Sequence, residues 1–165
     1  MHDGRQPSAK PYGLFGRAVG RKRSVRAGAT AAVHNGPMRV VFATAELAGV
    51  ANVGGLAAAA AGLVGELRRQ GVDVDVLMPD YGGIDLAGES RVPLDVPDWV
   101  GPASVRVGDH DVVGRLHLVD VPGIARSHPY LQPNGEGWPD NAERFFRFAR
   151  AVAAAVVADP PDVVH

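Results

Sequence analysis

The stretch MRVVFATAELAGVANVGGLAAAAAGLVGELRRQG, residues 38–71, decides the fold. Its apolar run at 40–43 is rich in β-branched and aromatic side chains, which is typical of a strand buried on both faces of a parallel sheet. Apolar residues then recur at helical spacing over 54–70, and Gly71 stands where a C-terminal helix cap belongs. A second strand over 72–78 completes a βαβ unit with parallel neighbouring strands. The expected apolar face of the helix consists of Leu56, Ala59, Ala60, Leu63, Val64 and Leu67.

A glycine pair, Gly54 and Gly55, begins this helix at the carboxyl edge of the predicted sheet. Ligands of open α/β sheets bind at that edge. Without a Cβ atom these residues let a ligand approach the backbone, and free amides at a helix start attract a phosphate or carboxylate. A tight turn that packs helix on strand explains the same residues, so both interpretations stay open.

Length and composition limit the class of protein. The 165 residues, 46% of them hydrophobic, suffice for one α/β domain with a core but not for two large domains. The chain has no cysteine, which excludes disulfides and thiolate metal sites and suits the cytoplasm, where we expect the protein. No apolar run approaches the ~20 residues of a transmembrane helix, so we expect no membrane partner.

Residues 1–37 form a basic segment, with a single acid, Asp3, and many Gly, Pro and Ala residues. Its composition predicts a disordered tail. Clustered positive charge is also a footprint of nucleic-acid binding. We favour disorder, or translation that starts at Met38, over nucleic-acid binding.

Two predicted features lie between the second strand and residue 114. The loop 79–84 falls at the same carboxyl edge, where Asp80 and Tyr81 either bind a polyol or only form a turn. Strands over 104–107 and 111–113, separated by 108–110, predict a β-hairpin at the edge of the sheet. Polar residues at a hairpin tip are usually solvated, and we assign no metal to them.

The last third predicts strand, loop, helix and strand. A core strand over 116–121 precedes an aperiodic loop, 124–139, whose aromatic and polar residues suit sugar binding. Asp140 is the expected N-cap of a helix to about 158, with Glu143 completing a capping box. A strand over 162–165 follows, and a further loop and helix would be expected after it, as in a domain cut short. The expected apolar face of the helix is Phe145, Phe146, Phe148, Ala149, Val152, Ala153 and Val156, with Arg144, Arg147 and Arg150 mainly on the other side.

Five motifs occur in the order seen in bacterial glycogen synthases and plant starch synthases: MRVVFATAE at 38–46, VGGLA at 53–57, VLMPDYGGI at 76–84, WPDNAERF at 138–145 and PDVVH at 161–165. The chain from residue 38 onward therefore resembles the N-terminal domain of this glycosyltransferase family. The resemblance implies a Rossmann-like parallel sheet with flanking helices, the N-terminal half of a GT-B fold. It also implies a retaining, metal-independent hexosyltransferase that transfers glucose from ADP-glucose, a co-substrate, to the non-reducing end of an α-1,4-glucan without a further cofactor.

The resemblance also implies site residues. The glycine loop and its flanking position 52 would contact the donor phosphates, and the remaining matched positions would contact sugar or acceptor. His165 matches the first His of a His-x-His-Asp-Trp segment whose second His would lie near the transferred glucose, so no catalytic set is complete in this chain. Donor contacts are expected from Asn52, Gly54 and Gly55, and sugar contacts from Glu46, Tyr81, Asp140, Asn141 and Arg144.

Two residues depart from the family pattern. Asn52 stands where the family has lysine, and Ala58 where it usually has aspartate. A neutral residue at position 52 removes direct charge stabilisation from a departing diphosphate, and the only lysines, Lys10 and Lys22, lie in the basic segment. Two functions therefore stay open: a glucan synthase domain that is inactive without the C-terminal GT-B domain, and a non-catalytic carbohydrate-binding remnant.

Overall fold

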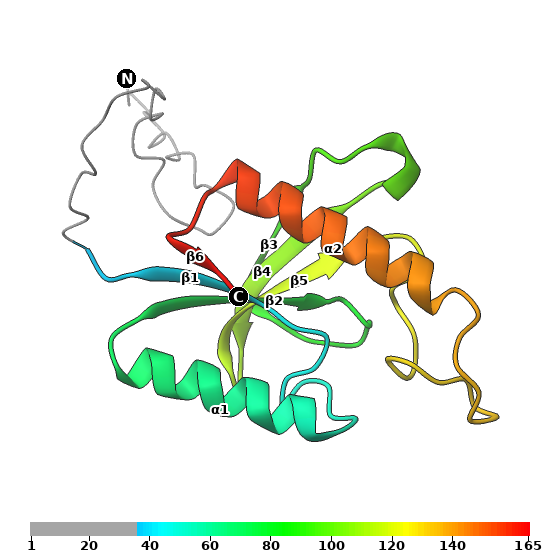
Figure 1. Ribbon diagram of the computed structural model, residues 1–165, viewed down its shortest axis with the longest axis horizontal. Helices are drawn as coiled ribbons and strands as arrows, with labels where there is room; N and C mark the ends of the chain where they lie inside the picture. The colour runs from blue at the N-terminus through cyan, green and yellow to red at the C-terminus, as the bar shows by residue number, and fades with distance from the viewer. Residues whose placement is uncertain (1–35) are drawn as a thin grey trace, which may run out of the picture.

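The computed structural model describes residues 36–165, so the expected basic tail lies outside the described residues except for Gly36 and Pro37. Figure 1 shows one sheet between two helices, with α1 on one face and α2 on the other. The fold is α/β, as predicted. Its elements are β1 (Arg39–Ala43), α1 (Gly55–Arg69), β2 (Asp73–Pro79), β3 (Ala87–Pro93), the 3-10 turn η1 (Asp98–Val100), β4 (Ser104–His110), β5 (Gly114–Asp120), α2 (Asn141–Ala158) and β6 (Val163–Val164).

The sheet has the strand order β3-β4-β5-β2-β1-β6. Strands β6, β1, β2 and β5 run parallel, with Val40 beside Val74 and Phe42 beside Val76. The predicted βαβ unit is therefore confirmed. Strands β3, β4 and β5 form an antiparallel meander, so β5 belongs to both parts of the sheet.

The hairpin lies in a different register from the predicted one. Strand β4 continues through 108–110 to His110, residues 111–113 form the turn, and β5 returns with Gly114 beside His110. Gly108 lies within β4 and not in the turn. A Cβ atom at this position would lie 2.7 Å from the Leu86 Cβ atom, so glycine is needed here for the close approach of Leu86. Strand β3 was not predicted, because its residues are exposed or half-buried and show no apolar alternation.

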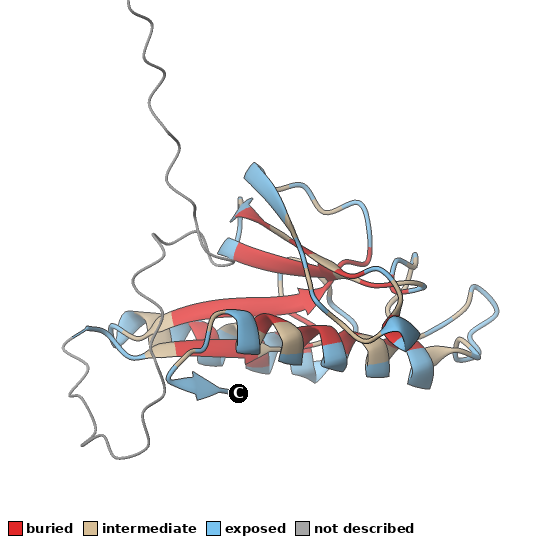
Figure 2. Ribbon diagram, turned by 90° about the horizontal axis from the view of Figure 1, so that it is seen from above, coloured by how far each residue is buried: buried red, intermediate tan, exposed pale blue. Residues whose placement is uncertain are grey.

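The core consists of two apolar layers, one on each face of the sheet. Figure 2 shows the buried residues concentrated in the strands and on the inner sides of the helices. One layer joins α1 to the sheet residues Val40, Phe42, Val74 and Met78, and the other joins α2 to the opposite face. None of the helices in residues 36–165 is long and apolar enough to cross a membrane.

The inner face of α1 is narrower than predicted. It buries Ala57, Ala60 and Val64, whereas Leu56 and Leu63 are 50% and 41% exposed. Small residues bring the helix close to the sheet, which leaves larger side chains at its margins. The predicted glycine cap is confirmed: Gly71 has φ +83° and donates to the Arg68 carbonyl, and the N–H of residue 72 reaches back to that of residue 67.

The start of α2 differs from the predicted capping box. The Asp140 side chain makes no cap hydrogen bond, and Glu143 instead accepts a 2.6 Å hydrogen bond from Arg147. The assignment of helix faces was also wrong at four positions, since Ala149 and Ala153 of the predicted apolar face are exposed. Phe146 is 70% exposed, whereas Arg144, expected on the outer side, is only 1% exposed.

Candidate functional site

Glu46 joins three separate segments at the carboxyl edge of the sheet. Its buried carboxylate follows β1 and accepts hydrogen bonds from the backbone N–H groups of Val53 (3.1 Å) and Gly54 (2.9 Å) through Oε2. Its Oε1 accepts a 2.8 Å hydrogen bond from the Tyr130 hydroxyl, which belongs to the long loop. The predicted site residue Glu46 thus fixes the glycine loop relative to the loop before α2.

These hydrogen bonds determine the charge of Glu46. Burial on its own raises the pKa of a carboxyl group, but the hydrogen bonds from Gly54, Tyr130 and Val53 outweigh it and lower the pKa of Glu46. Burial and the bond to Glu46 raise the pKa of Tyr130 to about 12. At neutral pH the pair is therefore a carboxylate that accepts from a protonated phenol.

The glycine pair faces open space. Apart from chain neighbours and the backbone of the same helix, a Cβ atom built on Gly54 or Gly55 would meet no atom of residues 36–165 within 4 Å, and Gly54 has an extended φ of −151°. Neither a positive φ nor close helix packing therefore requires glycine here, which weakens the tight-turn interpretation. The Gly54 amide, however, is not available as expected, because it already donates to Glu46.

A cavity of about 510 Å³ lies beside this loop. It brings together the predicted site residues Asn52 and Tyr81, which come from the loops after β1 and β2. The Tyr81 hydroxyl donates to the Ala45 carbonyl (2.9 Å), while Asp80 faces away and pairs with Arg106 (2.9 Å). The lining residues are Val50, Ala51, Asn52, Tyr81, Gly82, Ile84, Arg126, Ser127, His128 and Pro129.

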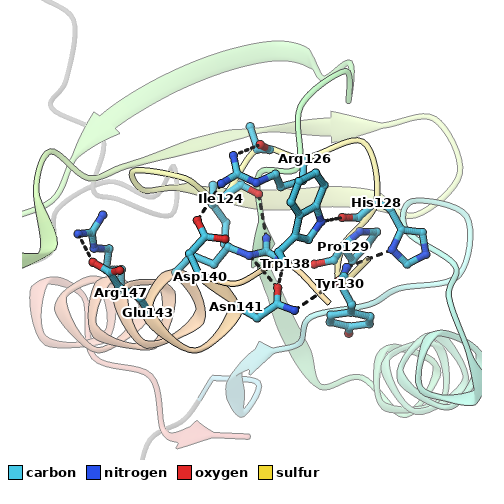
Figure 3. A network of polar contacts seen from close by, with 12 residues as sticks. Ile124, Arg126, His128, Pro129, Tyr130, Trp138, Asp140, Asn141, Glu143 and Arg147 are labelled. Carbon is cyan, nitrogen blue, oxygen red and sulfur yellow. Dashed lines mark hydrogen bonds and ion pairs between the residues drawn. The ribbon is translucent and has the colours of Figure 1, made fainter. Parts of the chain in front are cut away.

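Arg144 has a structural position that the motif did not suggest. Figure 3 shows the surrounding network at the start of α2. The guanidinium donates to the carbonyls of Ile124 (3.3 Å) and Pro129 and to the Asn141 Oδ1 atom (2.6 Å from Nη2). Burial lowers the pKa of Arg144. The expected sugar-binding arginine therefore holds the loop 124–139 against the helix and does not line the cavity.

The neighbouring motif residues are also engaged within the chain. Asn141 donates from Nδ2 to the Tyr130 carbonyl (2.9 Å), and Asp140 accepts a 2.8 Å hydrogen bond from Arg126. The Arg126 guanidinium lies over the Trp138 ring, 5.1 Å from its centre (Figure 3). The loop 124–139 is thereby ordered by its own contacts.

His165 lies beside the end of β1. Its backbone pairs with Val41 and Ala43, and its ring stacks on Phe42 with centroids 5.0 Å apart. It is not among the cavity-lining residues.

Sequence reasoning did not assign four residues of the site individually, namely Arg126, Ser127, His128 and Tyr130. Composition marked their loop, 124–139, as functional, but nothing in an aperiodic segment shows which side chains turn toward the sheet. The hydrogen bonds of Tyr130 and Arg126 fix that direction.

Comparisons with known proteins point to one family. A family model described as the starch synthase catalytic domain matches residues 39–165. A glycogen synthase of Rhodopseudomonas palustris (strain BisA53) is 34% identical over 140 residues, 78% of this chain and 28% of that protein. A glycogen synthase of Thioalkalivibrio sulfidiphilus (strain HL-EbGR7) is 38% identical over 140 residues, 78% of this chain and 29% of that protein.

A solved structure shows the same likeness. The catalytic domain of starch synthase IV from Arabidopsis thaliana, bound to ADP and acarbose, superimposes with a TM-score of 0.56 and 25% identity. The match covers 79% of this chain and 27% of that one. The chain thus spans little more than a quarter of the length of the proteins it matches.

Proposed function

This chain belongs to the starch synthase catalytic domain family, and on that basis we propose that it forms part of the N-terminal half of a GT-B glucosyltransferase. The proposed reaction transfers glucose from ADP-glucose, as co-substrate and without a separate cofactor, to the non-reducing end of an α-1,4-glucan. A nucleotide-sugar donor points to the cytoplasm as the compartment.

The observation that carries this proposal is the cavity beside the glycine loop. Its lining residues include Asn52, Ser127 and His128, whose side chains carry an amide, a hydroxyl and an imidazole. These groups donate and accept hydrogen bonds, as recognition of sugar hydroxyls requires. Glu46 fixes one wall of the cavity relative to the other through its bonds to Gly54 and Tyr130.

We assign the acceptor surface and the approach to the donor phosphates to this chain. The remaining catalytic and nucleotide-binding groups would come from the C-terminal GT-B domain, within the part of the family that this chain does not span. On its own, the chain is expected to bind glucan without transferring glucose.

A second function, a non-catalytic carbohydrate-binding remnant, is favoured by the state of the motif residues. Asn52 carries no charge. The side chains of Asn141 and Arg144 form hydrogen bonds with each other and with the loop 124–139. Such a remnant would keep the glucan surface and lack transfer under all conditions.

Binding tests the glucan surface directly. The full chain is titrated with maltooligosaccharides by calorimetry, together with the Asn52→Ala variant and an Asn134→Ala control. Asn134 belongs to the same loop as the cavity residues but does not line the cavity. We expect saturable binding that is weakened roughly tenfold by Asn52→Ala, the loss of about one hydrogen bond to a ligand. Absence of binding by a folded chain contradicts both functions.

Transfer separates the two functions. Labelled glucose incorporation from ADP-glucose into glycogen is measured with the chain alone and with the C-terminal part of a glycogen synthase relative added. Incorporation only in the mixture supports the enzyme, and glucan binding without incorporation in either sample supports the remnant.

A further inference from the structure

We propose that Asn134 is a site of spontaneous deamidation, in which the backbone nitrogen of Gly135 attacks the Asn134 side-chain amide and ammonia leaves. Water then opens the resulting succinimide to aspartate or isoaspartate. The two residues lie at the tip of the loop 124–139, between Tyr130 and Trp138. The inference is independent of the proposed function, because the chain reacts only with itself and with water.

A tight turn presents the reacting groups. Gly135 donates its N–H to the Gln132 carbonyl at 2.9 Å and has φ +85°, a conformation that favours glycine. Glycine is also the residue whose nitrogen attacks a neighbouring amide most readily, since no side chain hinders closure of the ring. Asn134, Gly135 and Glu136 are all exposed, so water can reach the succinimide.

Glu136 holds the Asn134 amide at both of its polar atoms. The Glu136 N–H donates to Asn134 Oδ1 at 3.0 Å, and Asn134 Nδ2 donates to Glu136 Oε2 at 3.1 Å. Because Oδ1 accepts from the nitrogen two residues further on, the turn folds the amide carbon, Cγ, against the nitrogen of the residue between them, Gly135. The Gly135 N–H bond lies in the peptide plane, so its hydrogen bond to Gln132 leaves the faces of the nitrogen uncovered.

The same contacts assist each part of the reaction. The Glu136 N–H polarises the Asn134 carbonyl and stabilises the negative charge that develops on Oδ1. Attack forms the bond between the Gly135 nitrogen and Cγ, and this nitrogen loses its proton. The Glu136 carboxylate lies next to Nδ2 and relays that proton to it, after which the Cγ–Nδ2 bond breaks and ammonia leaves. One water molecule then adds to either carbonyl of the succinimide.

The product alters the end of the loop. Aspartate places a second negative charge beside Glu136, whereas isoaspartate lengthens the main chain by one methylene group. Leu131 forms a bridge with Gly137, and the Trp138 N–H donates to the Tyr130 carbonyl at 3.1 Å. Both contacts depend on the present length of the main chain between them. Isoaspartate formation should therefore break this ladder.

The chain supplies a reference for the reactivity of the same dipeptide. Asn35 also precedes a glycine, Gly36, and lies outside the described residues. The residue that follows is Pro37, whereas Glu136 stands at the equivalent position after Asn134. Proline has neither an N–H to polarise the amide nor a carboxylate to relay a proton. The difference in rate between the two asparagines therefore measures what Glu136 and the turn contribute.

Peptide mapping by mass spectrometry tests the proposal. The full chain is incubated at neutral pH below its unfolding temperature, and the aspartate and isoaspartate fractions are followed with time at all four asparagines. We expect Asn134 to be modified severalfold faster than Asn35. Asn52 and Asn141, which precede valine and alanine, should stay intact over the same time. A rate at Asn134 equal to or below that at Asn35 would overturn the proposal.

Glu136→Gln tests the role of the carboxylate. The variant keeps the backbone N–H and the size of the side chain but cannot relay a proton, so modification of Asn134 should slow severalfold while that of Asn35 stays the same. Glu143→Gln is the matched control, since Glu143 is an exposed carboxylate that accepts from Arg147 on α2. Equal rates at Asn134 in the two variants would refute the role of Glu136.

A measurement in urea requires no folded variant. When the unaltered chain is unfolded, the contacts of the turn are lost, so the excess rate of Asn134 over Asn35 should disappear. An excess that persists in urea would show that the neighbouring sequence alone is responsible, and would overturn the role of the folded turn.

Discussion

The two helices begin at the same edge of the sheet with opposite arrangements. The start of α1, at Gly54 and Gly55, faces open space, and a Cβ atom there would meet no residue of 36–165 beyond its chain neighbours and its own helix backbone. The start of α2, at Asp140 and Asn141, is closed by bonds to Arg126, Tyr130 and Arg144. Both sequences match family motifs, yet only the first leaves its surface to a ligand.

The difference shows that motif residues can serve the fold at one position and leave the surface open at another. At α1 the chain supplies an empty surface, which stabilises nothing internally. At α2 polar side chains order a loop, and that loop in turn delivers Arg126 and His128 to the cavity. Stability and binding should therefore respond in opposite ways when the two helix starts are altered.

The largest effect is expected at the closed start. Arg144→Met removes the donors to the buried Ile124 carbonyl, the partly buried Pro129 carbonyl and Asn141, and should lower the free energy of unfolding by about 3–5 kcal/mol. Urea unfolding measures the loss. Arg147→Met on the same helix should cost less than ~1 kcal/mol because its pair is partly exposed. Similar losses for both variants would contradict the closed arrangement.

Acid should lower the stability of the fold because it protonates His117, which is buried in the sheet between the two helices. Burial lowers the pKa of His117 from its ordinary value of 6.5 to about 4. The unfolded chain then binds the proton first, so the free energy of unfolding falls as pH drops from 6.5 and levels off near 4, by roughly 3 kcal/mol in total. The free energy of unfolding should depend less on pH across this range in His117→Leu. In the His110→Leu control its pH dependence should stay unchanged. A slope that persists in His117→Leu would exclude this histidine as its cause.

The carboxylate that joins the two regions should have an intermediate effect. Glu46→Gln loses charge-assisted bonds to Val53 and Gly54 and should cost about 1–2 kcal/mol at pH 7. Because the folded state lowers the pKa of Glu46, this stabilisation is complete above its ordinary value of 4.5 and is lost as pH falls through the lowered pKa. Unfolding is compared in a His117→Leu background. The Glu and Gln forms should converge in strong acid, and a constant difference at all pH values would count against an ionised Glu46.

The smallest stability effect is expected at the open start. Gly54→Ala should lower the free energy of unfolding by only about 0.5–1 kcal/mol, roughly the difference between these residues as helix N-caps. Gly108→Ala is the contrasting variant, because its Cβ would lie 2.7 Å from that of Leu86. Thermal unfolding and maltooligosaccharide titration are measured together. Gly54→Ala should lower the affinity for the ligand while changing the unfolding temperature little. A large fall in unfolding temperature with unchanged affinity would show that the open start serves the fold.

Much of the fold could be predicted because local patterns agree with burial. Val41 and Leu77 belong to apolar runs that form the central strands, and Gly71 supplies the positive φ that its position demanded. Strand β3 escaped prediction because it lies at the edge with few buried side chains. The turn was predicted at 108–110 but lies at 111–113. Glycine at position 108 accommodates Leu86, a residue distant in sequence, and does not form a local turn.

The site was less predictable because its polar groups form hydrogen bonds with residues that are distant in sequence. Asp140 had the right position for a helix cap, but Arg126 from the preceding loop takes its carboxylate. The spacing of Arg144 predicted an exposed residue, but its guanidinium is buried because it donates to the Ile124 and Pro129 carbonyls of the preceding loop. Helical periodicity does not indicate such contacts. Glu46, Asn52 and Tyr81 were locatable because each follows a predicted strand and so must reach the same edge.

The two edges of the sheet carry a consequence for solution behaviour. Strand β3 guards one edge with charged side chains, Glu89 and Arg91, and with a proline, Pro93. Among residues 36–165, strand β6 forms the other edge and consists of two valines, 43% and 53% exposed. Charges and proline discourage intermolecular strand pairing, whereas a bare apolar edge templates it. Wherever β6 is left unpaired, molecules should therefore associate edge to edge at high concentration, which makes this strand the place to begin in improving colloidal stability.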